Sequence, residues 1–217
     1  MVTPGELEDY LEAHTTPEPE NLRALERRVN LHLLYPRMCS GKLQGRVLSM
    51  LTSMISPLRA LEIGTYAGYS ALCIAEGLPP GGHLDTVEID DEMEDFIRHE
   101  FAQSPYGERI TLHIGDAGDV LPQLAFATGF QPYDMAYIDA NKRIYLETYE
   151  QVLPLLRPGG FLLADNTLWD GKVLDGESRD AQTRGLMAFN DFVVSDPRVS
   201  VVMLPLRDGL TLIRKNS

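Results

Sequence analysis

From about residue 58 onward, strand-like segments alternate with helix-like segments along this chain. Such alternation is typical of a parallel sheet with helices on both faces. Near the end, Asp208-Gly209 separates two strand-like runs and favours a hairpin, so the last strand is expected to be antiparallel. The sequence therefore predicts an α/β, Rossmann-like, doubly wound sheet of seven strands. The expected strands are 59–63, 83–88, 109–114, 134–138, 160–164, 199–204 and 209–214, and the expected helices are 69–77, 92–103, 117–127, 145–156 and 180–195.

The first 56 residues have helical periodicity and no strand-like run. Leu22, Leu25 and Val29 share one helix face, and Leu7, Tyr10 and Leu11 share another. We therefore expect a single domain of residues 1–217, in which 1–56 form a helical N-terminal extension and 57–217 form the Rossmann-like core.

A turn with two glycines joins the first expected strand to the first expected helix. It reads Leu61-Glu62-Ile63-Gly64-Thr65-Tyr66-Ala67-Gly68-Tyr69-Ser70. Glycines at such a turn let backbone N–H groups approach a ligand closely. The dinucleotide pattern G-x-G-x-x-G is absent, and Glu62 replaces its first glycine. A carboxylate there suits a positively charged ligand, such as the sulfonium or ammonium group of S-adenosylmethionine. Close packing of a helix on a strand would also explain the two glycines.

Acidic residues follow the second and third expected strands. Glu88 ends the second strand, where an acid can accept hydrogen bonds from the two ribose hydroxyls of a nucleoside. Asp116, in Gly115-Asp116-Ala117, follows the third strand and could accept a hydrogen bond from the amino group of an adenine. A solvated acid at a strand end or in a turn is the alternative for each.

Oxygen-bearing side chains also follow the fourth and fifth expected strands. These are Asp139, Asp165 and Asn166. Carboxylate and amide oxygens select Mg²⁺ or Ca²⁺ over zinc or copper, so the sequence predicts a divalent cation here. Asp165-Asn166 could instead be an ordinary turn pair. The five histidines have no paired ligand spacing, so no zinc site is expected.

Charge and cysteine content limit the partners that we expect. The net charge of −13 disfavours nonspecific binding to nucleic acid or to an anionic membrane. The two cysteines, Cys39 and Cys73, imply no disulfide framework. The N-terminal segment lacks the features of a secretory signal, and no apolar run reaches membrane-spanning length. We therefore expect a cytoplasmic protein without a membrane partner.

Taken together, the motifs resemble those of the cation-dependent class I O-methyltransferases, the group that contains catechol and caffeoyl-CoA O-methyltransferases and many small bacterial enzymes. The resemblance covers residues 36 to 214, and two positions depart from the family pattern: Asn141, where Asp is usual, and Ala67, where Thr is usual. The motifs that carry it are Pro36-Arg37-Met38, Gln44-Gly45, 62–70, Glu88, 115–117, Asp139-x-x-Lys142, Pro158-Gly159-Gly160, Asp165-Asn166-x-x-Trp169 and Leu204-Pro205.

The resemblance implies a role for each matching residue. The methionine end of S-adenosylmethionine would lie along Met38 and Ser40, its ribose on Glu88, and its adenine near Asp116 and Ala117. Asp139 would serve both the cofactor and catalysis, and Lys142 would be the base. The residues implied to line the cofactor-binding loop are Glu62, Gly64, Tyr69 and Ser70, and those implied to bind the metal are Asp139, Asp165 and Asn166.

The expected function is methyl transfer from S-adenosylmethionine to a hydroxyl of a small phenolic acceptor with two vicinal hydroxyls. A homodimer is implied by the resemblance. Two alternatives stay open: a tRNA hydroxyuridine O-methyltransferase, and a non-catalytic, nucleoside-binding regulatory protein. A nicotinamide-dependent oxidoreductase is disfavoured because G-x-G-x-x-G is absent. The basic residues that could bind tRNA, or could simply be solvated helix faces, are Arg23, Arg27, Arg28, Arg37, Lys42 and Arg46.

Overall fold

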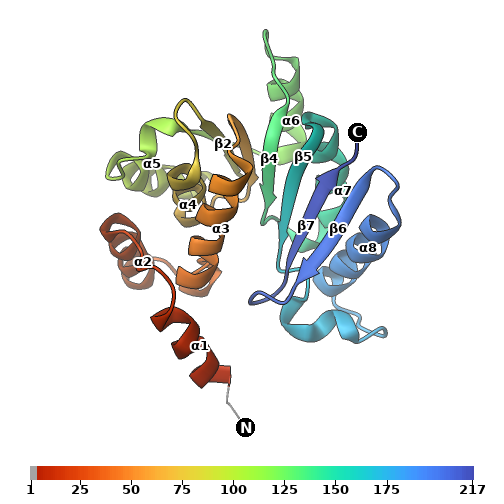
Figure 1. Ribbon diagram of the computed structural model, residues 1–217, viewed down its shortest axis with the longest axis horizontal. Helices are drawn as coiled ribbons and strands as arrows, with labels where there is room; N and C mark the ends of the chain where they lie inside the picture. Colours follow the sequence, from red (N-terminus) through yellow and green to blue (C-terminus); the bar gives the residue numbers. More distant parts are fainter. Residues whose placement is uncertain (1–3) are drawn as a thin grey trace.

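The computed structural model describes residues 4–217, and within them seven strands form one sheet in the order β3-β2-β1-β4-β5-β7-β6 (Figure 1). Neighbours from β3 to β5 pair in parallel, whereas β7 is antiparallel to both β5 and β6. The predicted mostly parallel, Rossmann-like sheet with an antiparallel last strand is confirmed. The strands are β1 (Arg59–Ile63), β2 (His83–Glu88), β3 (Ile110–Ile114), β4 (Tyr133–Ile138), β5 (Leu156–Asp165), β6 (Val199–Leu204) and β7 (Leu210–Lys215).

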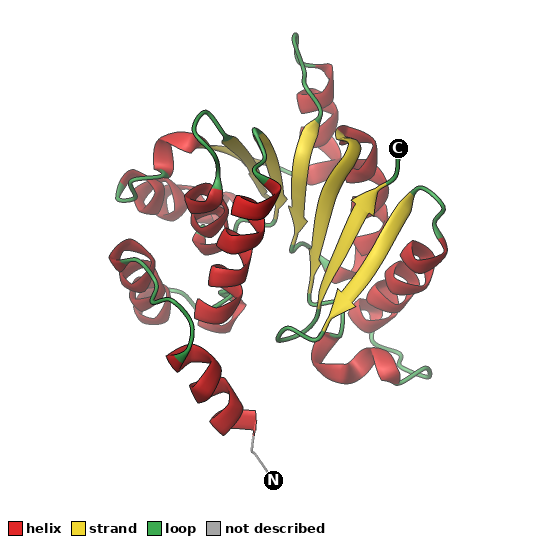
Figure 2. Ribbon diagram, viewed as in Figure 1, coloured by secondary structure: helices red, strands yellow, loops and turns green. Residues whose placement is uncertain are grey.

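Helices cover both faces of the sheet (Figure 2). Successive strand residues point to opposite faces, and β1 shows this clearly: Ala60 packs in one apolar cluster with the α2–α5 side, and Leu61 and Ile63 pack in another with α6, α7 and α8. The helices are α1 (Pro4–Ala13), α2 (Glu20–His32), α3 (Lys42–Ile55), α4 (Tyr69–Gly77), α5 (Glu94–Ala102), α6 (Ala117–Phe126), α7 (Tyr145–Val152) and α8 (Ala181–Ser195).

Two predicted boundaries are wrong by four residues for identifiable reasons, and the others differ by two residues at most. The helix expected over 145–156 ends at Val152, and a 3₁₀ turn follows over Leu153–Leu155, because Pro154 lacks the N–H that would continue the helix. β5 begins at Leu156 instead of 160, and its pairing with β4 shifts register between Tyr133 and Met135. This irregularity lets the strand contain Pro158-Gly159-Gly160, which in the sequence resembles a break.

The N-terminal helices differ in how they pack. Leu22, Leu25 and Val29 of α2 are buried, as their shared face predicts. The apolar residues of α1 remain exposed, with Tyr10 61% accessible and stacked on His14. In Figure 1, α1 projects away from the sheet. The division into a 1–56 extension and a 57–217 core stays a prediction, and residues 1–3 lie outside the described part.

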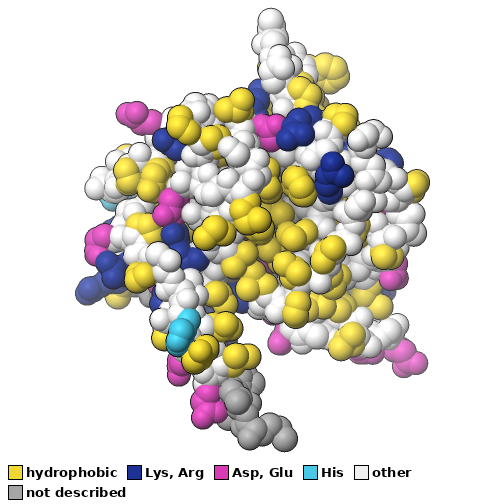
Figure 3. All heavy atoms as spheres, viewed as in Figure 1, with side chains coloured by type: hydrophobic (Ala, Val, Ile, Leu, Met, Phe, Trp, Pro, Cys, Tyr) yellow, Lys and Arg dark blue, Asp and Glu magenta, His cyan; other side chains and the backbone are white. Residues whose placement is uncertain are grey.

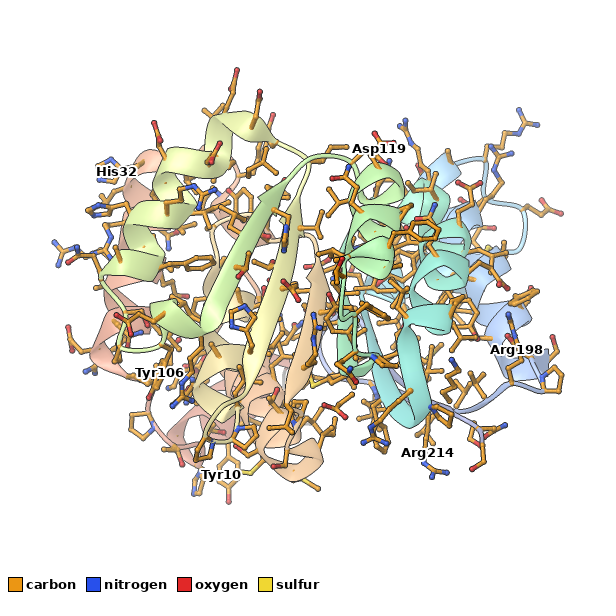
Figure 4. The ribbon with its side chains drawn as sticks, turned by 90° about the horizontal axis from the view of Figure 1, so that it is seen from above. Tyr10, His32, Tyr106, Asp119, Arg198 and Arg214 are labelled. Atoms are coloured by element: carbon orange, nitrogen blue, oxygen red, sulfur yellow. The ribbon has the colours of Figure 1, made fainter. Side chains whose placement is uncertain are left out.

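The sheet runs along the long dimension of the molecule. Seen from above, Arg198 and Arg214 lie at the end that carries β6 and β7, opposite His32 and Tyr106 (Figure 4). Apolar side chains gather over the strands at the β5–β6 end on the face seen in Figure 3. In the described part of the chain, none of the helices has the length and apolar character needed to cross a membrane.

Strand order reverses between β1 and β4, and this reversal fixes where a ligand can bind. β1 pairs with β2 on one side and with β4 on the other. In open α/β sheets the helices that follow two such strands diverge to opposite faces and leave a crevice outside the carboxyl ends of the strands. The residues after β1, β2, β4 and β5 are therefore the ones to inspect for a site.

Candidate active site

A large cavity, with a volume of about 1120 Å³, opens at the carboxyl ends of these strands. Its size is sufficient for a nucleoside-sized ligand together with a small second molecule. All but one of the sequence-predicted site residues line it. These are Met38, Ser40, Gly64, Tyr69, Ser70, Glu88, Asp116, Ala117, Asp139, Lys142, Asp165 and Asn166.

The glycine turn after β1 approaches the end of β4 very closely. Gly64 has φ of 98°, and a Cβ added there would lie 2.2 Å from the carbonyl oxygen of Asp139. Any larger residue would separate the two strand ends. Gly68 is the N-cap of α4, with φ of 84°, so the helix starts at the cavity wall and brings Tyr69 and Ser70 into the lining.

Glu88 is held by backbone donors from two loops. Its carboxylate accepts hydrogen bonds from the N–H groups of Thr65 (3.1 Å), Tyr66 (2.6 Å) and Asp90 (2.9 Å). The side chain therefore fixes the β1–α4 loop and also lines the cavity. A ribose bound here would meet a carboxylate that is already oriented.

Glu62 is the predicted site residue that does not line the cavity. It is fully buried behind the wall, where it accepts a hydrogen bond from Thr86 Oγ1 at 2.5 Å. Its Oε1 has no hydrogen-bond partner among the described residues. Burial raises the pKa of Glu62 to about 8, and the charges of Asp139 and Glu88 act in the same direction. The hydroxyl of Ser70 opposes this rise in the pKa of Glu62, and Ser70 itself lines the cavity.

Asp116 lines the cavity beyond the end of β3, at the edge of the sheet away from β5. Its side chain is the N-cap of α6 and accepts the N–H of Gly118 at 2.7 Å. A carboxylate at this position stabilises the helix start, so Asp116 already has a structural role beside the adenine contact that was expected for it. Ala117, the first residue of α6, lies next to it in the lining.

The acidic end of the cavity lies where β4 and β5 finish. Asp139 follows β4 directly, and its N–H donates to the carbonyl of Ile63 at 2.9 Å. Asp165 ends β5, and Asn166 follows it in a left-handed conformation with φ of 56°. Lys142 Nζ donates to Asp139 Oδ1 at 2.5 Å from the 3₁₀ turn η4 (Lys142–Ile144). This turn, which follows Asp139 by three residues, brings both side chains to one pocket.

A network that the sequence did not indicate holds Asp165. Gln44 Nε2 and the hydroxyl of Tyr137 both donate to Asp165 Oδ2, at 2.5 and 2.7 Å. The N–H of Asn166 donates to Oδ1 at 2.7 Å. Burial raises the pKa of Asp165 to about 6, and the charge of Asp139 adds to the effect. Gln44-Gly45 contributed to the resemblance, but no local pattern assigned Gln44 a role.

The turn between β6 and β7 also reaches the cavity, which the sequence analysis missed. The hairpin expected around Asp208-Gly209, between strands 199–204 and 209–214, is present, and its connection runs from Pro205 to Gly209. The N–H groups of Leu168 and Trp169 donate to the carbonyl of Asp208 at 2.6 and 3.1 Å. Arg207 and Asp208 consequently join Trp169 in the lining.

The donors at the acidic end fit a hard divalent cation. Within residues 4–217, no cluster of three or more His, Cys, Asp and Glu side chains could hold a metal. A cation would therefore rely on the carboxylates of Asp139 and Asp165 and on the amide oxygen of Asn166. Oxygen donors of this kind suit Mg²⁺ or Ca²⁺, which fill their remaining positions with water or substrate. A cation would also relieve the repulsion between the two neighbouring carboxylates.

Comparison with known proteins gives consistent matches. The model of a family described as O-methyltransferase matches residues 12–216. The catechol O-methyltransferase of Niastella koreensis is 35% identical over 174 residues, which is 78% of each protein. Caffeoyl-CoA O-methyltransferase 2 of Zea mays is 33% identical over 207 residues, or 91% of this chain and 77% of that protein.

Among solved structures, the O-methyltransferase TomG from Streptomyces achromogenes, crystallised in complex with SAM, has a TM-score of 0.89 and 29% identity. The superposition covers 97% of this chain and 96% of that one. The likeness extends over the whole sheet and its helices.

Proposed function

Because this chain belongs to the O-methyltransferase family, we propose that it transfers a methyl group from S-adenosylmethionine to a small aromatic acceptor. The acceptor carries two vicinal hydroxyls, one of which receives the methyl group, and a divalent cation assists the transfer. The observation that carries this proposal is the arrangement of the cavity. A fixed carboxylate, Glu88, lies near one end, and two carboxylates with a buried lysine lie near the other. The cavity would therefore hold the methyl donor and the methyl acceptor together.

We assign the cofactor to the part of the cavity between Glu88 and Asp116. Glu88 would accept the ribose hydroxyls, and Ala117 would lie against the adenine. Met38, Ser40, Tyr69 and Ser70 line the cavity and are assigned to the methionine end, together with Asp139. S-adenosylmethionine supplies the methyl group. The protein's task is to hold the acceptor oxygen close to that group and in line with it.

At the acidic end we assign the cation to Asp139, Asp165 and Asn166. A divalent cation there would stabilise negative charge on the acceptor oxygen. Lys142 lies within reach of the same space, because Nζ is held on Asp139. A divalent cation beside it would disfavour the charged form of Lys142. We propose that the neutral amine then takes the proton of the acceptor hydroxyl, or that the charged amine stabilises the oxygen after the proton has left. Gln44 and Tyr137 would keep Asp165 in position.

The tRNA alternative loses support when the basic residues are located. Four of the six cations of the candidate patch form ion pairs with acids, so they are not free to meet phosphates. The pairs are Arg23–Glu20, Arg28–Glu100, Lys42–Glu12 and Arg46–Glu76. An acidic chain whose basic residues are neutralised in this way is a poor match for a polyanion. The regulatory alternative is disfavoured because Lys142, Asp139, Asp165 and Asn166 all line the cavity.

The proposal is tested with labelled S-adenosylmethionine and a panel of acceptors in the presence of Mg²⁺. We expect methyl incorporation into catechol and into flavonoids with a vicinal diol. We expect much less incorporation into phenol and resorcinol, which lack the neighbouring hydroxyl. Transfer to tRNA lacking its own methyl group, with none to catechols, would instead establish the nucleic-acid alternative. The homodimer and the cytoplasmic location stay predictions.

A further inference from the structure

The turn between β6 and β7 holds the side chain of Arg207 at the cavity. The N–H of Gly209 donates to the carbonyl of Leu206 at 2.8 Å and closes the turn. A Cβ on Gly209 would lie 2.6 Å from the backbone nitrogen of Leu168. The turn therefore packs against the segment that follows Asp165 and Asn166.

Arg207 itself has an unfavourable backbone conformation. Its φ is 47°, in the left-handed region that residues with a Cβ rarely adopt. Gly or Asn would fit this position with less strain. The conformation is maintained by the contacts of the turn, and it directs an arginine to the cavity.

Among the side chains that the structure describes, no carboxylate lies within ion-pair distance of the Arg207 guanidinium. Nη1 lies 3.5 Å from Gln44 Oε1, and it would be 3.3 Å from a Cβ on Gly41. Glycine at position 41 therefore leaves room for the guanidinium. By contrast, Lys142, another cation in the lining, is paired with Asp139.

Arg207 is connected to the acidic end through a single side chain. The amide oxygen of Gln44 accepts from Arg207, and its amide nitrogen donates to Asp165 Oδ2 at 2.5 Å. Arg207 and the acidic end therefore line the same cavity, with Gln44 between them. We infer that the methyl acceptor carries a carboxylate at the end away from its hydroxyls and that Arg207 binds it.

The charges around the cavity favour a carboxylate over a neutral group. The chain has a net charge of −13 and repels anions over most of its surface. An anionic ligand is therefore expected to bind beside a cationic side chain. A guanidinium binds a carboxylate through two parallel hydrogen bonds. Asp208 lies beside Arg207 in the lining, and its negative charge disfavours a doubly charged phosphate more than a singly charged carboxylate. Glu26 is a further acid in the field of Arg207.

This inference rests on the proposed methyl transfer, and a matched pair of acceptors tests it. The acceptors are 3,4-dihydroxybenzoate and its methyl ester, which share the vicinal diol and differ in charge. We expect wild-type kcat/KM to favour the acid by about 10-fold to 100-fold, the range of a charge-assisted hydrogen bond. Arg207→Gln should reduce this preference to within about threefold, and Arg207→Lys should retain only part of it.

A binding measurement and a control variant accompany the kinetics. Calorimetry with S-adenosylhomocysteine and Mg²⁺ present should show the same loss of preference in the dissociation constants of the two acceptors. Arg98, on α5, is exposed and paired with Glu94, so Arg98→Gln should keep the wild-type preference. A wild type that methylates the ester as well as the acid would overturn the inference and leave the proposed function standing. A wild type that methylates neither of these, nor catechol, would overturn both.

Discussion

Lys142 is a buried cation whose position depends on one carboxylate. Only 7% of its surface is accessible, and Nζ lies 2.5 Å from Asp139 Oδ1 and 5.2 Å from the centre of the Tyr145 ring. Burying an ammonium group is costly unless it is paired. An ordinary surface lysine at the start of a helix would not be enclosed in this way. The burial supports the assignment of Lys142 to the acceptor hydroxyl.

Replacing Lys142 should impair turnover more than cofactor binding. We expect Lys142→Ala and Lys142→Met to lower the single-turnover rate of catechol methylation by on the order of a hundredfold or more, as for loss of a positioned acid–base group. The affinity for S-adenosylhomocysteine should change little. Lys42→Met, which removes a partly exposed lysine paired with Glu12, is the control. A rate within threefold of wild type with the same pH profile would show that Lys142 is not the base.

Glu62 should make the stability of the protein depend on pH. Its pKa is raised to about 8, first by burial, so the folded state holds the proton more tightly than the unfolded state. The contribution of Glu62 to stability is then full below about pH 4.5 and is lost as pH rises toward 8. Glu62→Gln removes this titration. We expect urea unfolding to show the variant gaining about 3–4 kcal/mol relative to wild type between pH 5 and pH 8. An unchanged difference would mean that Glu62 is ionised in the folded protein.

At the level of elements, the C-terminal helices are joined by a polar cluster far from the cavity. Asp196 follows α8 and accepts hydrogen bonds from Tyr149 Oη of α7 (2.8 Å) and from Arg198 Nη2 (2.6 Å). Arg198 also contacts Glu150 at 2.6 Å. The hydrogen bonds from Arg198 lower the pKa of Asp196 to about 2. The cluster therefore links α7, α8 and the start of β6.

Asp196→Asn should destabilise the protein more at neutral pH than in acid. A lowered pKa stabilises the fold above about pH 4, and this stability is lost as pH falls toward 2. Because Arg198 is 44% exposed, solvent screening reduces the effect, and we expect a loss of about 1–2 kcal/mol at pH 7. Unfolding by urea at pH 7 and at pH 3 measures it. Glu150→Gln, at an exposed partner of the same arginine, should cost less than about 0.5 kcal/mol.

At the scale of the whole molecule, the sequence predicted those elements and contacts that depend on residues close together in the chain or on the order of the strands. The strand 59–63 and the helix 69–77 have the bounds expected for them, because an apolar run followed by a glycine turn specifies both. Asp139 and Asp165 were predicted to meet because carboxyl ends of neighbouring parallel strands share an edge, and β4 does pair with β5.

The parts of the site that were missed come from tertiary packing. Gln44 is one residue on an amphipathic helix, and nothing in its neighbours indicates that α3 packs beside β4 and places it on Asp165. Arg207 lies in a turn whose type was recognised but whose position against Leu168 was not. Such contacts join segments separated by more than 100 residues or depend on how a loop folds back, and no sequence period encodes them.

The dependence of methyl transfer on a divalent cation tests the central claim most directly. The rate of transfer from labelled S-adenosylmethionine to catechol is measured after dialysis against EDTA and again after titration with Mg²⁺. We predict that chelation abolishes turnover and that Mg²⁺ restores it in the wild type but not in Asp165→Ala, while S-adenosylhomocysteine still binds throughout. Full activity in EDTA, or restoration by Mg²⁺ in the variant to the wild-type rate, would contradict the account.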